Sequence, residues 1–368
     1  MKVILISKTV EPTTGLGTMT YNHALELHKR DINFDLLLPT GAHHFNCQFS
    51  DRVKYVLPNL PLSFSATWID FLLLTRLFKK VKIDSESQTI IHSIADFPYA
   101  VVARLLAKNN KLPFIFTAHG TYSVAPFTKL IDRFLFLKTY KEAAVIMAVS
   151  NFTANRMREM AGFDRKINVI LNPVAAHFDQ DSPEMKRVDL PPSGRFILSV
   201  GPLKSRKGMD VLIKALPLIK KEIPDIYLLI VGEGDYITKD NLIIFDKLSY
   251  GQLAFLFNKC DVFALTPRYV NHQFEGYGLV YLEAGLYRKP VVGSFSGGVP
   301  EAVIDGQTGI LVPENDVEAT AAAIIKILQN KSLADCLGEN NFKLSQERNW
   351  DDYINKVIKL YQRILSKT

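Results

Sequence analysis

Short apolar runs of strand length alternate with stretches of helical periodicity along the first half of the chain. The runs are rich in Val, Ile, Leu and Phe and end in polar residues or glycine. Between them, segments such as 18–30 and 100–109 repeat apolar residues three or four positions apart, as one face of a helix does. Unbroken apolar runs that alternate with such helices predict parallel strands buried on both faces. The predicted strands are residues 3–7, 34–39, 89–93, 114–118 and 145–149.

The same alternation restarts near residue 195, after a stretch of different composition. Residues 173–194 are rich in Pro, Asp and Glu and lack an apolar period, so we expect them to form a linker. The sequence therefore predicts an α/β chain of two Rossmann-like, doubly wound domains, residues 1–172 and 195–351. The predicted strands of the second domain are 196–200, 227–231, 242–245, 262–266 and 291–294.

The length and the cysteines fit a protein of the reducing cytosol. A chain of 368 residues is long enough for a core in each of two domains. Cys47, Cys260 and Cys336 are scattered and odd in number, so they indicate neither a disulfide framework nor a metal site. The apolar run at residues 3–6 is short for a signal peptide, and no run approaches the length that crosses a bilayer. We expect a cytoplasmic protein that touches a membrane at most peripherally, at its inner face.

The net charge of +7 is concentrated in the first half of the chain. Residues 1–190 hold 23 Lys and Arg against 17 Asp and Glu. This excess suits an anionic acceptor or an anionic membrane surface. Residues 64–82 mix apolar and basic residues and could lie in a lipid interface, although a core helix with a basic last turn explains them better. No basic segment alternates with aromatic residues as nucleic-acid modules do, so we expect no nucleic-acid partner.

Two carboxylates frame a glycine-rich segment, Glu275-Gly-Tyr-Gly-Leu-Val-Tyr-Leu-Glu283. The glycines favour a loop, and the apolar residues that follow predict a helix with Glu283 on its second turn. The N–H groups of Gly278, Leu279 and Val280 would then lie at a helix N-terminus, where donors and dipole favour a phosphate. A nucleotide-diphospho-sugar, with a diphosphate between two hydroxyl-rich groups, fits such a site. An exposed loop before a core helix would explain the segment if it stood alone.

A cationic turn, Gly201-Pro-Leu-Lys204-Ser-Arg206-Lys207-Gly208, follows the predicted strand 196–200 and precedes a predicted helix. At the carboxyl edge of a sheet, Arg206 as a bidentate fork and Lys207 as a point charge can neutralise a diphosphate. A solvated basic turn explains the same residues. In both interpretations we expect Lys207 on an exposed polar turn, where its truncation leaves the stability of the fold nearly unchanged.

The order of these motifs resembles the donor-binding half of the retaining glycosyltransferases of family 4, which have the GT-B fold and a Glu-x7-Glu segment. The resemblance covers roughly residues 196–316, and the first half matches more loosely. It implies an enzyme that moves a sugar from a nucleotide-diphospho-sugar to a hydroxyl of a glycan or lipid-linked saccharide, with retention of configuration. It also implies two domains that face each other across a cleft, with residues 352–368 forming a helix that crosses back to the N-terminal domain.

The resemblance also implies roles for individual residues. Arg206 and Lys207 would hold the leaving diphosphate, Glu275 the hydroxyls of the sugar and Glu283 those of the ribose. His119, directly after the predicted strand 114–118, would contact the outer hydroxyl of the sugar. The alternative for His119 is a structural residue bonded to backbone.

A glycine-rich connection, Thr13-Thr-Gly15-Leu-Gly17-Thr, follows the first predicted strand. The resemblance counts Gly15 and Gly17 with the donor-binding residues, on a loop that lies across the cleft from the donor phosphates and touches the acceptor. A plain tight turn explains the same glycines equally well. The segment lacks the third glycine of a dinucleotide-binding fingerprint, which disfavours a dehydrogenase.

We expect no metal and no other cofactor. Asp179-Gln-Asp181 spells the Asp-x-Asp of manganese-dependent glycosyltransferases, but it lies in the predicted linker, away from any strand end. One departure from the family concerns its usual Gly-Arg-Leu, which is Gly201-Pro202-Leu203 in this chain. Arg206 is our candidate for the missing positive charge. The alternatives are a nucleotide-sugar epimerase of the same fold, which needs no acceptor, and a non-catalytic partner subunit of a glycosyltransferase.

Overall fold

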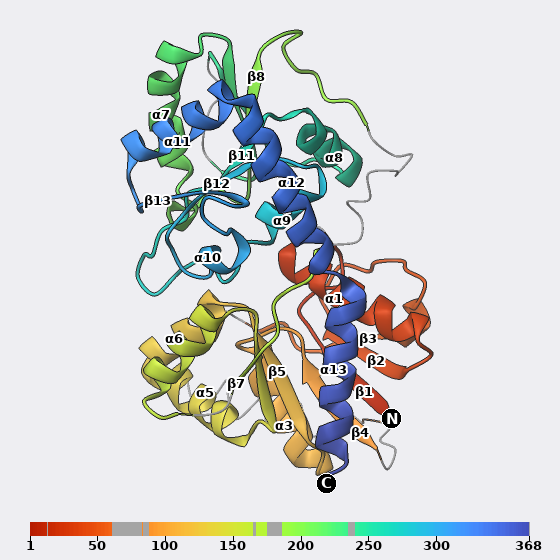
Figure 1. The fold of residues 1–368 in the computed structure, drawn as a ribbon. Helices are drawn as coiled ribbons and strands as arrows, with labels where there is room; N and C mark the ends of the chain where they lie inside the picture. The colour runs from red at the N-terminus through yellow and green to blue at the C-terminus, as the bar shows by residue number, and fades with distance from the viewer. Residues whose placement is uncertain are drawn as a thin grey trace. The chain divides into compact units, whose positions relative to one another are not determined.

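The structure is a computed structural model that describes residues 1–12, 14–60, 83, 88–164, 167–174, 186–234 and 240–367. Residues 64–82 and the Asp179–Asp181 pair lie outside the described residues. The chain divides into two compact units, drawn in Figure 1. The first unit is Met1–Asn172 together with Trp350–Thr368, and the second is Pro173–Asn349.

A parallel sheet forms the centre of the first unit, with strand order β3-β2-β1-β4-β5-β6-β7. Its inner strands β1, β4 and β5 are buried along their whole length, as the unbroken apolar runs predict. Strand β3 was not predicted; it lies at the edge of the sheet, and most of its residues are only partly buried. The strands are β1 Lys2–Ile6, β2 Asn33–Pro39, β3 Val53–Leu57, β4 Thr89–Ser93, β5 Phe114–Ala118, β6 Val145–Ala148 and β7 Ile167–Val169.

Helix α1 begins at Gly15, so the prediction of a glycine-rich turn at residues 13–18 was wrong. The hydroxyl of Thr14 accepts the Gly17 N–H at 3.1 Å and caps the helix. Gly17 is needed for close packing, because a Cβ there would lie 1.8 Å from the Glu11 carbonyl oxygen. The helices of this unit are α1 Gly15–Lys29, α3 Tyr99–Asn110, α4 Thr121–Val124, α5 Leu130–Glu142, α6 Asn151–Ala161 and α13 Trp350–Leu365.

Helix α13, the last of the chain, packs on α1 and β4 within the first unit. In the core, the Tyr361 hydroxyl lies 2.5 Å from His92 Nδ1 and 3.0 Å from His23 Nε2. His92 Nε2 lies 2.8 Å from the Thr117 hydroxyl, and all four side chains are buried. These hydrogen bonds tie the end of the chain to residues far earlier in the sequence.

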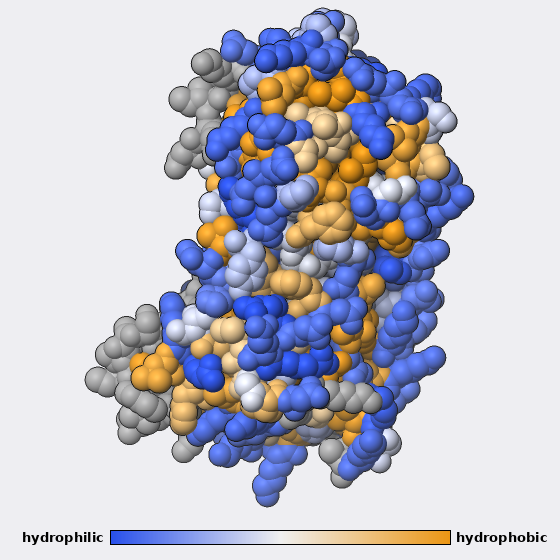
Figure 2. All heavy atoms as spheres, turned by 60° about the vertical axis from the view of Figure 1, so that its left-hand side comes forward, coloured by the Kyte–Doolittle hydropathy of each residue, from blue (hydrophilic) through white to orange (hydrophobic). Residues whose placement is uncertain are grey.

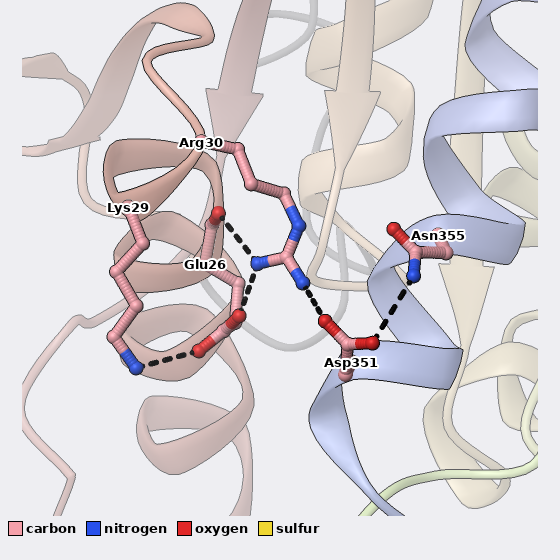
Figure 3. A network of polar contacts seen from close by, with 5 residues as sticks. All are labelled: Glu26, Lys29, Arg30, Asp351 and Asn355. Atoms are coloured by element: carbon pink, nitrogen blue, oxygen red, sulfur yellow. Dashed lines mark hydrogen bonds and ion pairs between the residues drawn. The ribbon is translucent and has the colours of Figure 1, made fainter.

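A second set of polar contacts joins the same two helices nearer the surface (Figure 3). The guanidinium of Arg30, the residue directly after α1, contacts Glu26 of that helix and Asp351 on α13. Lys29 pairs with the second oxygen of Glu26 at 2.8 Å, and Asn355 donates to Asp351 at 3.3 Å. Since Asp351 is largely exposed, we attribute most of the docking of α13 to the buried residues rather than to this network.

The second unit also has a parallel sheet, with strand order β10-β9-β8-β11-β12-β13. Helices α7 and α11 pack together, as do α9 and α12. The order reverses between β8 and β11, and the carboxyl ends of strands at such a point are the usual place for a ligand. The strands are β8 Arg195–Val200, β9 Ile226–Val231, β10 Leu242–Phe245, β11 Val262–Ala264, β12 Val291–Ser294 and β13 Gly309–Val312. The helices are α7 Met209–Glu222, α8 Tyr250–Lys259, α9 Leu279–Leu286, α10 Val299–Ala302, α11 Val317–Gln329 and α12 Lys331–Glu347.

Hydrophilic residues cover much of the face drawn in Figure 2, with apolar residues between them. Among the described residues, no helix combines the length and the apolar character that a membrane crossing requires.

We expect the stability of the first unit to fall as the pH is lowered from neutral toward 5. Burial lowers the pKa of His23 to about 3 and that of His92 well below its ordinary value. Both groups titrate at about 6.5 in an unfolded chain. Their contribution is therefore complete above about pH 6.5 and is lost below it, by up to about 1.4 kcal/mol per pH unit for each histidine.

Trp350 of α13 is buried in this unit, so urea unfolding followed by tryptophan fluorescence reports on its stability. His23→Gln should flatten the pH dependence, and His43→Gln, which changes an exposed histidine, should leave it as in the wild type. Equal pH dependence in the wild type and His23→Gln would contradict this account.

Candidate active site

The cationic turn of the second unit is a short 3-10 helix, Ser205–Lys207, that follows β8 and precedes α7. Gly208 ends it with a φ of +68°, a conformation that favours glycine. A Cβ at Gly208 would also lie 1.8 Å from the Thr266 carbonyl oxygen. The glycine therefore lets the turn lie directly against the chain that leaves β11.

Arg206 and Lys207 share one oxygen of Glu275. Lys207 Nζ lies 2.6 Å from Glu275 Oε2, and Arg206 NH1 lies 3.3 Å from the same atom. The expectation of an exposed Lys207 was wrong, because the residue is only 8% exposed. Two cations against one carboxylate leave an unbalanced positive charge at the carboxyl edge of the sheet.

Glu275 is ionised at neutral pH. Burial acts to raise the pKa of its carboxyl, but the charges of Lys207 and Arg206 outweigh burial and hold the pKa below its ordinary value. The backbone of Glu275 is also fixed, since its carbonyl oxygen accepts the Gly298 N–H at 2.9 Å. Gly297 has a φ of +57°, and a Cβ there would lie 2.3 Å from the same carbonyl. The turn at residues 296–298 thus holds Glu275 in place.

Helix α9 begins directly after Gly278, which has a φ of +97°. Gly278 has no side chain to cap the helix, so the first-turn N–H groups, including those of Leu279 and Val280, present the positive end of the dipole. A Cβ at Gly278 would lie 2.7 Å from the ring of Tyr281, whose hydroxyl donates to the Leu265 carbonyl at 2.6 Å. Tyr281 therefore anchors the start of α9 to the residue after β11.

Glu283 lies on the second turn of α9, as predicted, and is half-buried. Burial raises the pKa of its carboxyl to about 7, against the opposing charge of Lys207. The two glutamates therefore differ in charge near neutral pH, although the same lysine influences both.

His119 lies at the carboxyl end of β5 in the first unit. Its Nε2 lies 2.7 Å from the Ile94 carbonyl oxygen, and its backbone N–H donates to Asp96 Oδ2 at 3.3 Å. Burial lowers the pKa of His119 to about 4, against the bond to Ile94, so the ring is neutral at pH 7. A carbonyl only accepts, so Nε2 carries the proton and Nδ1 is left as an acceptor.

Asp96 is a buried carboxyl that the sequence analysis missed. Its Oδ2 accepts from the Ser123 hydroxyl at 2.9 Å as well as from His119. Burial raises the pKa of Asp96 to about 7, against these hydrogen bonds. In the sequence, the feature that marks Asp96 as a candidate site residue is its position shortly after the predicted strand 89–93.

The candidate residues fall into two groups. Gly15, Gly17 and His119 belong to the first unit. The second unit brings the remaining candidates together at one sheet edge: Arg206, Lys207, Glu275, Gly278, Leu279, Val280 and Glu283. In the part of the chain that the structure describes, no group of His, Cys, Asp and Glu has a metal-binding arrangement.

The two Rossmann-like units give the chain the GT-B fold, and the sheet of the second unit carries a cationic turn and the uncapped start of α9 at its carboxyl edge. The sequence model described as glycosyl transferases group 1 matches residues 181–344, and that described as Glycosyltransferase Family 4 matches residues 13–178. The chain belongs to this family of glycosyltransferases and is an enzyme of that class.

The chain is similar to an uncharacterised glycosyltransferase of Methanocaldococcus jannaschii, at 27% identity over 98% of this chain and 99% of that protein. It is also similar to a GDP-mannose-dependent α-(1-6)-phosphatidylinositol monomannoside mannosyltransferase of Mycolicibacterium smegmatis, at 34% identity over 39% of this chain and 41% of that protein. Among solved structures, Anabaena HepE in complex with UDP and glucose matches with a TM-score of 0.75 at 17% identity, over 99% of this chain and 100% of that one.

Lys207→Ala should lower the free energy of unfolding of the second unit by about 1–3 kcal/mol, because Glu275 would remain buried with Arg206 as its nearest cation. The matched control is Lys204→Ala, which removes an exposed lysine from the same turn and should change that free energy by less than about 0.5 kcal/mol. Urea unfolding followed by circular dichroism gives both values. Equal effects of the two substitutions would show that the Lys207–Glu275 pair does not stabilise the fold.

Proposed function

We propose that the enzyme transfers a sugar from a nucleotide-diphospho-sugar to a hydroxyl of a saccharide or lipid-linked saccharide, with retention of configuration. The observation that carries this proposal is the arrangement of Arg206 and Lys207 on one oxygen of Glu275. Their unbalanced positive charge suits the diphosphate on which negative charge grows as the glycosidic bond breaks. The first-turn N–H groups of α9 add donors for the same phosphates.

Arg206, in this proposal, replaces the arginine that the family has at the position of Pro202. Glu275 accepts hydrogen bonds from the transferred sugar, and Glu283 accepts them from the ribose. The unprotonated Nδ1 of His119 accepts one from an outer hydroxyl of the sugar. The leaving phosphate itself takes the proton of the acceptor hydroxyl, so no enzyme nucleophile and no metal ion is required.

The relatives suggest candidate substrates rather than one choice. HepE was solved with UDP and glucose, whereas the Mycolicibacterium relative is a GDP-mannose-dependent phosphatidylinositol monomannoside mannosyltransferase. A lipid-linked acceptor agrees with peripheral contact at the inner face of an anionic membrane. Leu130 and Phe134 of α5, which are 86% and 45% exposed, support such contact. Lys138 lies 4.3 Å from the Phe134 ring centroid and adds positive charge beside them.

The direct test is a transfer assay with UDP- and GDP-sugars and lipid-linked acceptors, in which release of the nucleoside diphosphate is measured. We expect release that depends on the acceptor and continues in excess EDTA, because cations of the chain hold the diphosphate. A new isomer of the donor formed without acceptor would instead indicate an epimerase. Activity lost in EDTA and restored by manganese would contradict the metal-free site.

The two glutamates should respond differently to truncation. Glu283→Ala should weaken the binding of free nucleotide and of nucleotide-sugar, because this residue is assigned to the ribose. Glu275→Ala should leave the binding of free nucleotide nearly intact and reduce turnover. Calorimetry with UDP and GDP measures the first effect, and the transfer assay measures the second.

The pH dependence adds a control to this comparison. Since the pKa of Glu283 is about 7, its carboxylate form becomes more populated between pH 6 and 8. Affinity for a nucleotide-sugar should therefore rise over this range in the wild type and not in Glu283→Ala. The opposite order of effects for Glu275 and Glu283 would mean that the donor lies in the reverse direction.

A further inference from the structure

Arg268, four residues after the end of β11, binds the backbone of the cationic turn twice. Its own N–H donates to the Arg206 carbonyl at 2.9 Å, and its Nε donates to the Ser205 carbonyl at 2.7 Å. No local motif marks this residue, because Ser205 and Arg206 lie more than sixty positions earlier in the chain. Its side chain is 17% exposed.

The guanidinium of Arg268 is itself held at its other two nitrogens. NH2 contacts the Asp210 carboxylate at the start of α7, and NH1 contacts Asn315 Oδ1 after β13. All three guanidinium nitrogens have partners, and Asp210 balances the charge. Arg268 is therefore less available than a free arginine to bind an anion. Arg206 and Lys207 differ in this respect, because they share a single carboxylate.

The residue before Pro267 completes the support of the turn. The Thr266 hydroxyl donates to the Gly208 carbonyl at 2.9 Å, directly after the two cations. The segment 266–268 thus contacts Ser205, Arg206 and Gly208 in succession. A three-residue 3-10 helix has few hydrogen bonds of its own, so these contacts fix the direction in which the two cations leave the backbone.

We propose that Arg268 is a positioning residue that fixes Arg206 and Lys207 at the diphosphate of the donor. The proposal rests on the function proposed above, and it adds a residue that no motif in the sequence singles out. A positioning residue acts through the groups that it holds, so its removal should misplace both cations while their charges remain. Misplacement by about 1 Å is enough to reduce turnover by about a hundredfold in many enzymes.

The test compares Arg268→Ala with Arg268→Lys and with a control, Arg195→Ala. Arg195 pairs with Asp261 at 2.7 Å in the same unit and has no contact with the turn among those described. We expect Arg268→Ala to lower kcat at least about tenfold with a smaller change in the KM of the acceptor. Arg268→Lys keeps the charge but lacks the planar fork, so it should not restore activity. Arg195→Ala should retain wild-type kcat.

Two further measurements separate positioning from a general loss of structure. In a Lys207→Ala background, Arg268→Ala should lower kcat less than it does in the wild type, because part of its effect passes through Lys207. Equal losses in both backgrounds would overturn the proposal. The second measurement is calorimetry with inorganic pyrophosphate, whose binding should weaken at least about tenfold in Arg268→Ala and Arg268→Lys but not in Arg195→Ala.

Pyrophosphate binding also distinguishes failure of this inference from failure of the proposed function. If the wild type transfers no sugar yet binds pyrophosphate, and only the Arg268 variants lose that binding, the proposed function fails and the role of Arg268 stands. If the wild type does not bind pyrophosphate, or if Arg268→Lys behaves as wild type, the role of Arg268 is wrong. If Arg268→Ala does not fold, Arg268→Lys decides by the same criteria.

Discussion

The sharing of one Glu275 oxygen by Lys207 and Arg206 is the interaction on which the candidate site depends. It joins a turn after β8 to the loop before α9, two segments 68 residues apart in the chain. Burying a carboxylate is unfavourable unless cations compensate it, and here two cations do so. Gly208 and Gly297 are needed beside this ion pair, because a Cβ at either position would clash with a backbone carbonyl oxygen. The oxygen is that of Thr266 for Gly208 and that of Glu275 for Gly297. The resulting excess of positive charge lies beside the N-terminus of α9, where an anion finds donors as well.

The buried polar contacts in the core of the first unit join neutral groups. Tyr361 of α13 bonds to His92 and His23 in the buried core, and burial keeps both histidines uncharged. His119 is likewise neutral, and its fixed tautomer comes from the Ile94 carbonyl. The polar core around Tyr361 thus uses directed hydrogen bonds between uncharged partners, whereas the candidate site of the second unit pairs charged groups. This contrast suits a division in which one unit recognises hydroxyls and the other a diphosphate.

Local patterns in the sequence predicted much of the fold, and contacts between distant segments account for what they missed. The strands at residues 89–93, 114–118, 242–245 and 291–294 have the predicted bounds, because each is a short run rich in β-branched and other apolar residues. The start of α1 was wrong, since Gly15 and Gly17 favour a turn by composition while the Thr14 cap favours a helix. The family assignment is confirmed, and the roles of the individual site residues stay predictions. The burial of Lys207 and the contacts of Arg268 have no local signal, because their partners come from other segments of the chain.

The most direct test of the central claim is a crystal structure of the enzyme with a nucleotide-diphospho-sugar. The account predicts that oxygens of the diphosphate lie within hydrogen-bond distance of Lys207 Nζ, the Arg206 guanidinium and the N–H groups at the start of α9. Glu283 would then contact the ribose and Glu275 the sugar. A diphosphate bound elsewhere, with Lys207 and Arg206 still paired only with Glu275, would contradict it.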